Sequence, residues 1–299
     1  MTEINPSPPL WQIRQMFADE GSSEPFFARL WINLFELRDL AINARFHGEQ
    51  PEQHKKDFDD LYEPVLTALQ ACREATKEIV RLVRDHREKV RSGSIVQFQP
   101  NAVSYSENID RPLHQAVSKL LVNGVVAMDR SQDVTKLFGI DIGSVFTKSN
   151  NFERGMAKLR QLGHPDLERY LRTARNTWAK DFRAQRVAFE HDGWVSPPAR
   201  YVVGPDHSVE FEEPTVGRVA VSSFASRSIP RLLAFVETVL VYAMKAVITE
   251  SAFGRFANIV EIPTDQRDPT IPRRFAYLPK DRPHPEWTPQ YRDDDFPLD

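Results

Sequence analysis

Cysteine is almost absent from this sequence of 299 residues, since Cys72 is the only one. A single cysteine allows neither an internal disulfide nor a zinc site built from cysteines, and it fits a reducing compartment. The first eleven residues hold an acid and three prolines, where a secretory signal peptide would have a basic start and an apolar run. We therefore expect a cytoplasmic protein.

An excess of either charge is missing as well. The 39 lysines and arginines nearly balance the 42 aspartates and glutamates, which leaves a formal net charge of −3. Such a balance creates no overall field that would draw the protein to nucleic acid or to anionic lipid. Any contact with nucleic acid must therefore come from a local basic patch.

A long, uninterrupted apolar run is also missing. The most apolar stretch, Leu232 to Ile248, contains Glu237 and Lys245 and is shorter than the ~20 apolar residues that cross a bilayer. We interpret this stretch as a buried core helix and expect no membrane partner.

Several motifs of common enzyme classes are not found. The sequence has no Gly-Lys-Ser/Thr phosphate loop, no Gly-x-Gly-x-x-Gly after a strand and no Gly-x-Ser-x-Gly elbow. These absences disfavour P-loop hydrolysis of nucleotides, Rossmann cofactors and esterases of the hydrolase fold. The histidines at positions 54, 114, 164, 207 and 284 do not pair at the spacing of metal ligands. We expect neither a metal nor a cofactor.

Helical periodicity, in contrast, is abundant. Apolar residues make up 41% of the chain, enough to bury a large core, and they recur at helical spacing in several segments. The predicted helices cover residues 25–46, 51–91, 112–128, 152–162, 166–191 and 228–254. Pro64 is expected to kink or restart the second helix, and Asp110 is expected to cap the third. Residues 94–108 are interpreted as a polar loop.

A small β element and a proline-rich end complete the expected fold. Two short strand patterns flank Gly204-Pro205-Asp206 and predict a hairpin within residues 200–213. From Glu261 onward, eight prolines and several acids argue against a further helix. We therefore expect a mainly α fold, a helical bundle with a β-hairpin insertion and an extended C-terminal arm. The expected parts are a helical region over 1–108, the bundle over 109–258 and the arm over 259–299.

Basic residues gather on one face of the predicted helix over 166–191. At about 100° per residue, an arc facing away from the apolar stripe holds Arg172, Arg175, Arg183 and Arg186. His191 lies near the edge of this arc. Guanidinium groups can hold phosphate oxygens while an imidazole moves a proton, which metal-free cleavage of an RNA phosphodiester requires. This interpretation makes Arg172, Arg175 and Arg183 candidates for RNA binding.

A structural interpretation of the same residues stays open. Arg186 and Glu190 have the i, i+4 spacing of an ion pair on a solvated helix face. His191 can be a surface residue at the helix C-terminus without a catalytic role. Asp181 and Asp192 further dilute the positive charge.

The segment Arg186-Val187-Ala188-Phe189-Glu190-His191 has the Arg-x-x-x-x-His spacing of HEPN domains, which are helical bundles of many prokaryotic toxins and defence proteins. The chain resembles this family in placing the motif at the end of a long helix, with another long helix downstream. The resemblance implies a metal-independent endoribonuclease in which Arg186 steadies the phosphate and His191 assists proton transfer from the 2′-hydroxyl. It also implies a site shared across a homodimer, and inactive relatives with binding roles are common in the family.

Helix geometry constrains this hypothesis. Five residues on an unbroken helix correspond to about 140° of rotation, so Arg186 and His191 point in different directions. Their convergence requires either a frayed end at Asp192-Gly193 or a second copy of the chain.

A non-catalytic alternative belongs to a different class. The near-zero net charge and the possible ion pairing favour a helical interaction protein that assembles with itself or with another chain. Basic and aromatic residues of the tail are compatible with this alternative, namely Arg273, Arg274, Phe275, Tyr277 and Trp287. We favour packing of this tail on its own bundle, because exposed aromatic residues reduce solubility.

Overall fold

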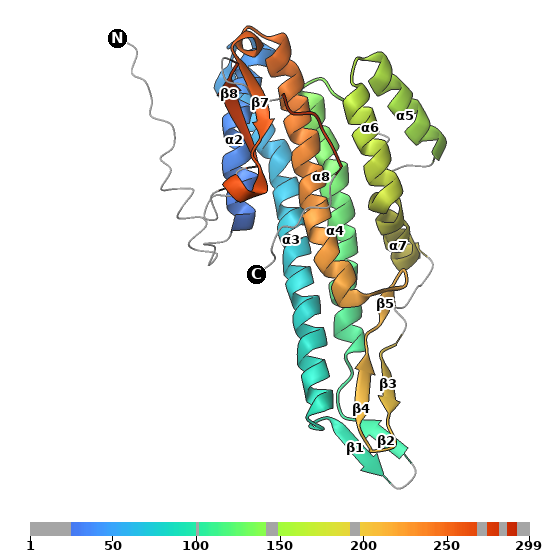
Figure 1. The fold of residues 1–299 in the computed structure, drawn as a ribbon. Coiled ribbons are helices and arrows are strands. Elements are labelled where there is room, and N and C mark those ends of the chain that lie inside the picture. The colour runs from blue at the N-terminus through green and yellow to red at the C-terminus, as the bar shows by residue number, and fades with distance from the viewer. Residues whose placement is uncertain are drawn as a thin grey trace. The chain divides into compact units, whose positions relative to one another are not determined.

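A computed structural model describes residues 25–99, 102–141, 149–191, 198–267, 274–280 and 286–291 of the chain. Long helices dominate these residues, as Figure 1 shows. The helices are α2 (Pro25–Phe46), α3 (Pro51–Arg91), α4 (Asp110–Leu137), α5 (Ser149–Gln161), α6 (Pro165–Ala174), α7 (Lys180–His191) and α8 (Val221–Glu250). The mainly α fold predicted from periodicity is confirmed.

Short strands pair only with their neighbours along the chain. They are β1 (Val96–Gln99), β2 (Ala102–Tyr105), β3 (Arg200–Val203), β4 (Val209–Glu212), β5 (Thr215–Val216), β6 (Val219–Ala220), β7 (Ala257–Glu261) and β8 (Phe275–Pro279). Each odd-numbered strand forms an antiparallel two-stranded ribbon with the next one. The hairpin predicted within 200–213 is β3–β4, in which Tyr201 lies opposite Phe211.

Two compact units make up the described chain. The first combines the residues up to Asp57 with those between Val241 and Thr288, and the second combines Phe58–Leu240 with the residues from Pro289 onward. The boundaries expected near residues 108 and 258 therefore fall inside the second and the first unit, respectively.

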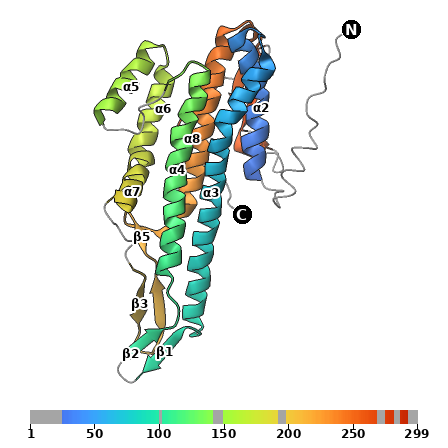
Figure 2. The same ribbon diagram turned by 180° about the vertical axis from the view of Figure 1, so that it is seen from behind.

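Helices α3, α4 and the first part of α8 run side by side in the second unit (Figures 1 and 2). Helix α7 packs against α4, and Gly124 of α4 lies at this contact. A Cβ at Gly124 would lie 2.5 Å from Cζ of Phe182, so the missing side chain makes room for the Phe182 ring. Close approach of two helices is a common reason for glycine within a helix.

The ribbon β1–β2 corrects the polar loop expected over 94–108. Its apolar residues alternate with polar ones, since Val96 and Phe98 are separated by Gln97. This period of two favours a strand over an irregular loop. The helix that follows also begins differently, because Asp110 is its first residue and the Oδ1 atom of Asn108 accepts a hydrogen bond from the Asp110 backbone N–H at 2.8 Å.

A π-helical turn, η1 (Arg175–Ala179), divides the helix predicted over 166–191 into α6 and α7. A π turn holds more residues than an α turn, so it shifts the angular positions of all later side chains. The prediction that four arginines lie on a single arc assumed an unbroken helix with about 100° of rotation per residue. The turn therefore removes the basis for placing Arg172 and Arg186 on one face.

Helices α3 and α8 each contain a proline without ending there. Helix α3 continues through Pro64, so the expected restart is not found. Helix α8 begins at Val221, before the expected start at Ser228, and continues through Pro230. By length and composition α8 could cross a membrane, and 83% of its most apolar window is buried. These properties are compatible with a core helix and with a membrane span.

The first unit contains the β7–β8 ribbon and the described parts of the C-terminal arm. Trp287 is buried against Phe275, with 4.8 Å between the ring centroids, and its backbone N–H donates to the carbonyl of Ile259 at 3.0 Å. The Lys245 ammonium donates to the Trp287 carbonyl at 2.6 Å. Phe275 and Trp287 are both buried in the first unit. Arg273 and much of the region after residue 280 lie outside the described residues.

Candidate functional site

Arg186 lies near the C-terminal end of α7 and forms an ion pair within its own helix. Its Nη2 atom is 2.5 Å from Oε2 of Glu190, and both side chains are 30% exposed. The i, i+4 pair anticipated from the sequence is therefore present. The Nε atom of Arg186 is buried and has no hydrogen-bond partner among the described residues. The Nη2 atom of this guanidinium is therefore paired with a carboxylate, whereas the Nε atom has no hydrogen bond to a described residue.

Arg183 lies one turn before Arg186 and connects α7 to α4. Its Nη1 atom donates to Oδ1 of Asp129 at 2.9 Å. The Arg183 side chain is 29% exposed, so water still reaches this pair. The contact explains why the arginine faces α4, and it partly neutralises the positive charge beside Arg186.

Arg172 and Arg175 belong to a different cluster, next to α5. Arg172 donates to Glu168 at 2.7 Å and to Glu153 at 2.9 Å. Arg175 is buried, and its guanidinium carbon lies 4.3 Å from the centroid of the Phe152 ring. Burial lowers the pKa of Arg175. The predicted basic arc is thus two separate pairs of arginines, one facing α5 and the other near the end of α7.

The carboxylate of Glu168 organises the cluster beside α5. It is buried and accepts hydrogen bonds from Arg160 at 2.8 Å and 2.9 Å and from Arg172. Burial alone would raise the pKa of Glu168, but the two arginines hold it below its usual value. A charge pair of this kind stabilises the junction of α5 and α6, so we assign Arg172 a structural role in the protein as described.

His191 is the last residue of α7, and its side chain lies outside the described residues. A second histidine, which the sequence did not single out, lies against the same part of α7. The imidazole of His114 in α4 stacks on Phe189, with 4.5 Å between centroids and 25° between planes. The Nδ1 atom of His114 is buried without a hydrogen-bond partner in the described part of the chain. No local spacing could reveal this pairing, because the two residues are distant in sequence.

The α4–α7 seam, defined by Asp129, Arg183, Arg186, Phe189 and His114, has a limited but clear chemical capacity. A guanidinium can bind phosphate oxygens, and an imidazole can accept or donate a proton near neutral pH. Buried polar atoms are normally hydrogen-bonded, so two unpartnered nitrogens on one seam need an explanation. Within the described residues, no group of three histidines, cysteines or acids could hold a metal ion.

A second area of interest lies where the ribbons β1–β2 and β3–β4 meet the end of α3. The side chains of Phe98, Val202 and Val203 are exposed by 48%, 48% and 44%, respectively. Beneath them, His86 is buried, and its Nε2 atom is 2.8 Å from the hydroxyl of Tyr201. A groove of about 550 Å³ runs beside Phe98. This end of the second unit therefore has exposed apolar side chains next to the packed rings of His86, Tyr201 and Phe211.

The structure therefore places Arg183 and Phe189 of α7 against Asp129 and His114 of α4, leaves Arg186 paired within α7, and puts Arg172 and Arg175 in a separate cluster. The end of α7 is the strongest candidate for a reactive site because unpartnered buried nitrogens and the histidine of the sequence motif occur there together. No protein-family model, curated protein or solved structure matches this chain.

Proposed function

We propose that this protein is a HEPN-like RNA-binding protein or metal-independent endoribonuclease, with Arg186 and His191 at its centre. The observation that best supports this proposal is the presence of two buried, unpartnered nitrogens on the α4–α7 seam, Nε of Arg186 and Nδ1 of His114. A buried donor without a partner costs about 1–3 kcal/mol, and a bound phosphate group would supply the missing acceptor for the guanidinium.

The proposed roles follow from charge and exposure. Arg186 holds a phosphate oxygen and exchanges its pairing with Glu190 for the substrate, since both groups remain partly exposed. Arg183 adds a second contact to the RNA backbone, next to Asp129. His191 moves the proton of the 2′-hydroxyl, and His114 is a further candidate for this step. Arg175 packs on Phe152 in the separate cluster beside α5 and is too buried to touch RNA, so it has no part in this site.

We further propose that two copies of the chain share the site. Arg186 and His191 diverge by about 140° on one helix, so a twofold partner offers the simplest way to bring an arginine and a histidine together. A cytoplasmic location and a place in a prokaryotic toxin or defence system are part of this proposal, and both derive from the resemblance of the motif.

The experiment is cleavage of a mixed RNA pool in EDTA by the wild type and by His191→Ala. Cleavage that yields 2′,3′-cyclic phosphate ends and is lost in the variant supports the nuclease. Binding of the RNA pool without cleavage, weakened at least tenfold by Arg186→Gln, supports the binding function. Arg111→Gln is the matched control, because Arg111 is an exposed arginine in the first turn of α4. If the wild type neither cleaves nor binds the RNA pool, the proposal is contradicted.

A non-catalytic interaction function is the second candidate, and the exposed apolar side chains of Phe98, Val202 and Val203 favour it. Apolar groups exposed together on a soluble surface often belong to a protein interface. The test is the mass of the protein in solution, compared between the wild type and Phe98→Ser. A dimeric wild type and a monomeric variant support assembly through the ribbons, whereas equal masses contradict it.

A further inference from the structure

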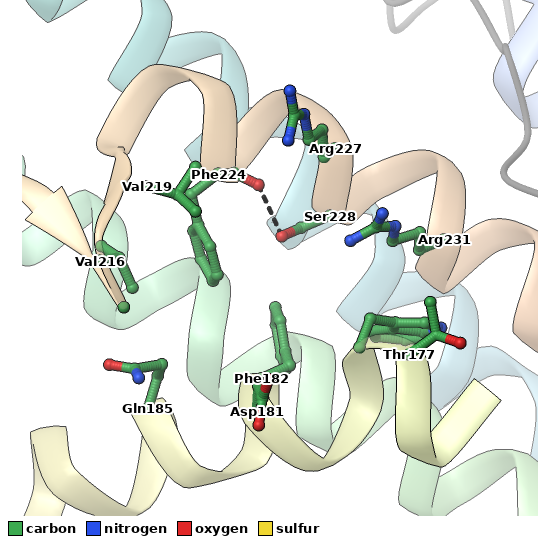
Figure 3. Close-up of a pocket in the computed structure, with 12 residues that line it drawn as sticks. Thr177, Asp181, Phe182, Gln185, Val216, Val219, Phe224, Arg227, Ser228 and Arg231 are labelled. Carbon is green, nitrogen blue, oxygen red and sulfur yellow. Dashed lines mark hydrogen bonds between the residues drawn. The ribbon is translucent and has the colours of Figure 1, made fainter. Parts of the chain in front are cut away.

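A cavity of about 250 Å³ lies within the second unit, between the η1–α7 segment and the start of α8 (Figure 3). No local pattern of residues predicts this cavity. Its apolar part contains Trp178, Phe182 and Phe224. The rings of Phe182 and Phe224 are nearly parallel, with 5.9 Å between centroids and 12° between planes. Aromatic walls of this kind favour a flat, apolar group in the cavity.

The indole of Trp178 supplies an unused hydrogen-bond donor at this cavity. The residue is only 5% exposed, and its Nε1 atom has no hydrogen-bond partner in the described part of the chain. A buried indole N–H usually finds an acceptor. Trp178 also lies on the π turn η1, and such turns occur often at functional sites.

Two arginines of α8 give the cavity a positive side. Arg227 and Arg231 lie one turn apart on α8, across from Asp181 of α7, as Figure 3 shows. Because Arg227 is exposed and has no ion pair with another described residue, its guanidinium favours an anionic group at this wall.

We propose that this cavity binds a small planar aromatic anion, an aryl carboxylate or an aryl phosphate. The ring would lie among Trp178, Phe182 and Phe224, and the anionic group would face Arg227. The volume is slightly below the ~300 Å³ at which pockets for drug-sized ligands begin, so a ligand with one ring fits best. This inference does not depend on the function proposed above.

The test uses the full-length protein with ¹⁵N-labelled tryptophan, whose five indole N–H groups give separate NMR signals. Trp178→Phe assigns the signal of Trp178. The probes are benzoate, phenyl phosphate, benzyl alcohol and inorganic phosphate. We expect saturable shifts of the Trp178 signal with benzoate or phenyl phosphate, and at least tenfold weaker binding of benzyl alcohol and of inorganic phosphate.

A variant of Arg227 distinguishes binding in the cavity from nonspecific binding elsewhere on the protein. Arg227→Gln should weaken binding of the aryl anion about tenfold, which is the scale of one hydrogen bond to a charged group. Arg111→Gln, which removes an exposed arginine outside the cavity, should leave the affinity unchanged. The proposal is overturned if no probe shifts the Trp178 signal, if inorganic phosphate binds as tightly as phenyl phosphate, or if both arginine variants behave like the wild type.

Discussion

The imidazole of His114 stacks on the ring of Phe189, with 4.5 Å between the two centroids. This contact joins α4 to α7 one helical turn beyond Arg186, which is the part of the chain that carries the Arg-x-x-x-x-His motif. A helix end with this motif is therefore anchored to a neighbouring helix. Such an anchor would hold Arg186 in a constant position relative to α4.

The stacked pair should contribute measurably to stability. Pairs of stacked rings contribute about 0.5–1.5 kcal/mol beyond the burial of their area. We expect a coupling free energy in this range from a double-mutant cycle of His114→Ala and Phe189→Ala, measured by urea denaturation. Additive effects of the two substitutions would show that the ring contact does not stabilise α7.

Substitution of Gly124 should loosen the contact of α4 with α7. A Cβ in Gly124→Ala would lie 2.5 Å from the Phe182 ring, and overpacking typically costs about 1–3 kcal/mol. Alanine favours a helix by up to about 1 kcal/mol, so we expect a net destabilisation of roughly 1 kcal/mol. Urea denaturation measures this change, and Phe182→Leu in the same chain should relieve it. A variant more stable than the wild type would contradict the close approach.

The sequence predicted the helices well and the site only in part. Regular spacing of apolar residues revealed α2, α3 and most of α4, because this signal is local. The Arg186–Glu190 pair was also visible, since its residues are four apart. Contacts between helices, such as Arg183 with Asp129, have no local signal.

The π turn was missed for a different reason. One wider turn leaves the local pattern of apolar residues almost unchanged, although it rotates every side chain beyond Ala179. The ribbon β1–β2 was missed although its strands, with four residues each, are as long as those of the predicted hairpin β3–β4. The predicted hairpin has the turn residues Gly204-Pro205-Asp206 between its strands, whereas only Pro100-Asn101, without a glycine, separates β1 from β2.

The buried imidazole of His86 should make stability depend on pH. Burial lowers the pKa of His86 below the usual histidine value of about 6.5, while Glu107, 3.7 Å away, partly opposes this effect. The unfolded chain then binds the proton more readily than the folded one, so stability falls as the pH decreases through 6.5 toward the lower pKa of the folded state.

The measurement is urea denaturation at pH 7.5 and at pH 5.5. We expect the wild type to lose more of its free energy of unfolding than His86→Gln does, because glutamine does not titrate and can still reach the Tyr201 hydroxyl. Equal losses in the two proteins would show that other groups cause the pH dependence.

Cys72 should be unreactive in the folded protein. Its thiol is buried, and burial raises the pKa of this thiol far above its usual range. Because the thiolate is the reactive form, iodoacetamide should modify Cys72 only after the chain unfolds. Mass spectrometry before and after addition of urea measures this difference. Rapid modification without urea would indicate that α3 opens readily around Cys72.

Single-turnover cleavage of RNA in EDTA, compared between the wild type and Arg186→Gln, tests whether the end of α7 carries the reactive site. We expect the wild type and Arg111→Gln to cleave at the same rate and to leave 2′,3′-cyclic phosphate ends. Loss of one charge-assisted contact to the phosphate should slow Arg186→Gln by about 10- to 100-fold. A wild type that cleaves while Arg186→Gln keeps the full rate would contradict the assignment of the site to the end of α7.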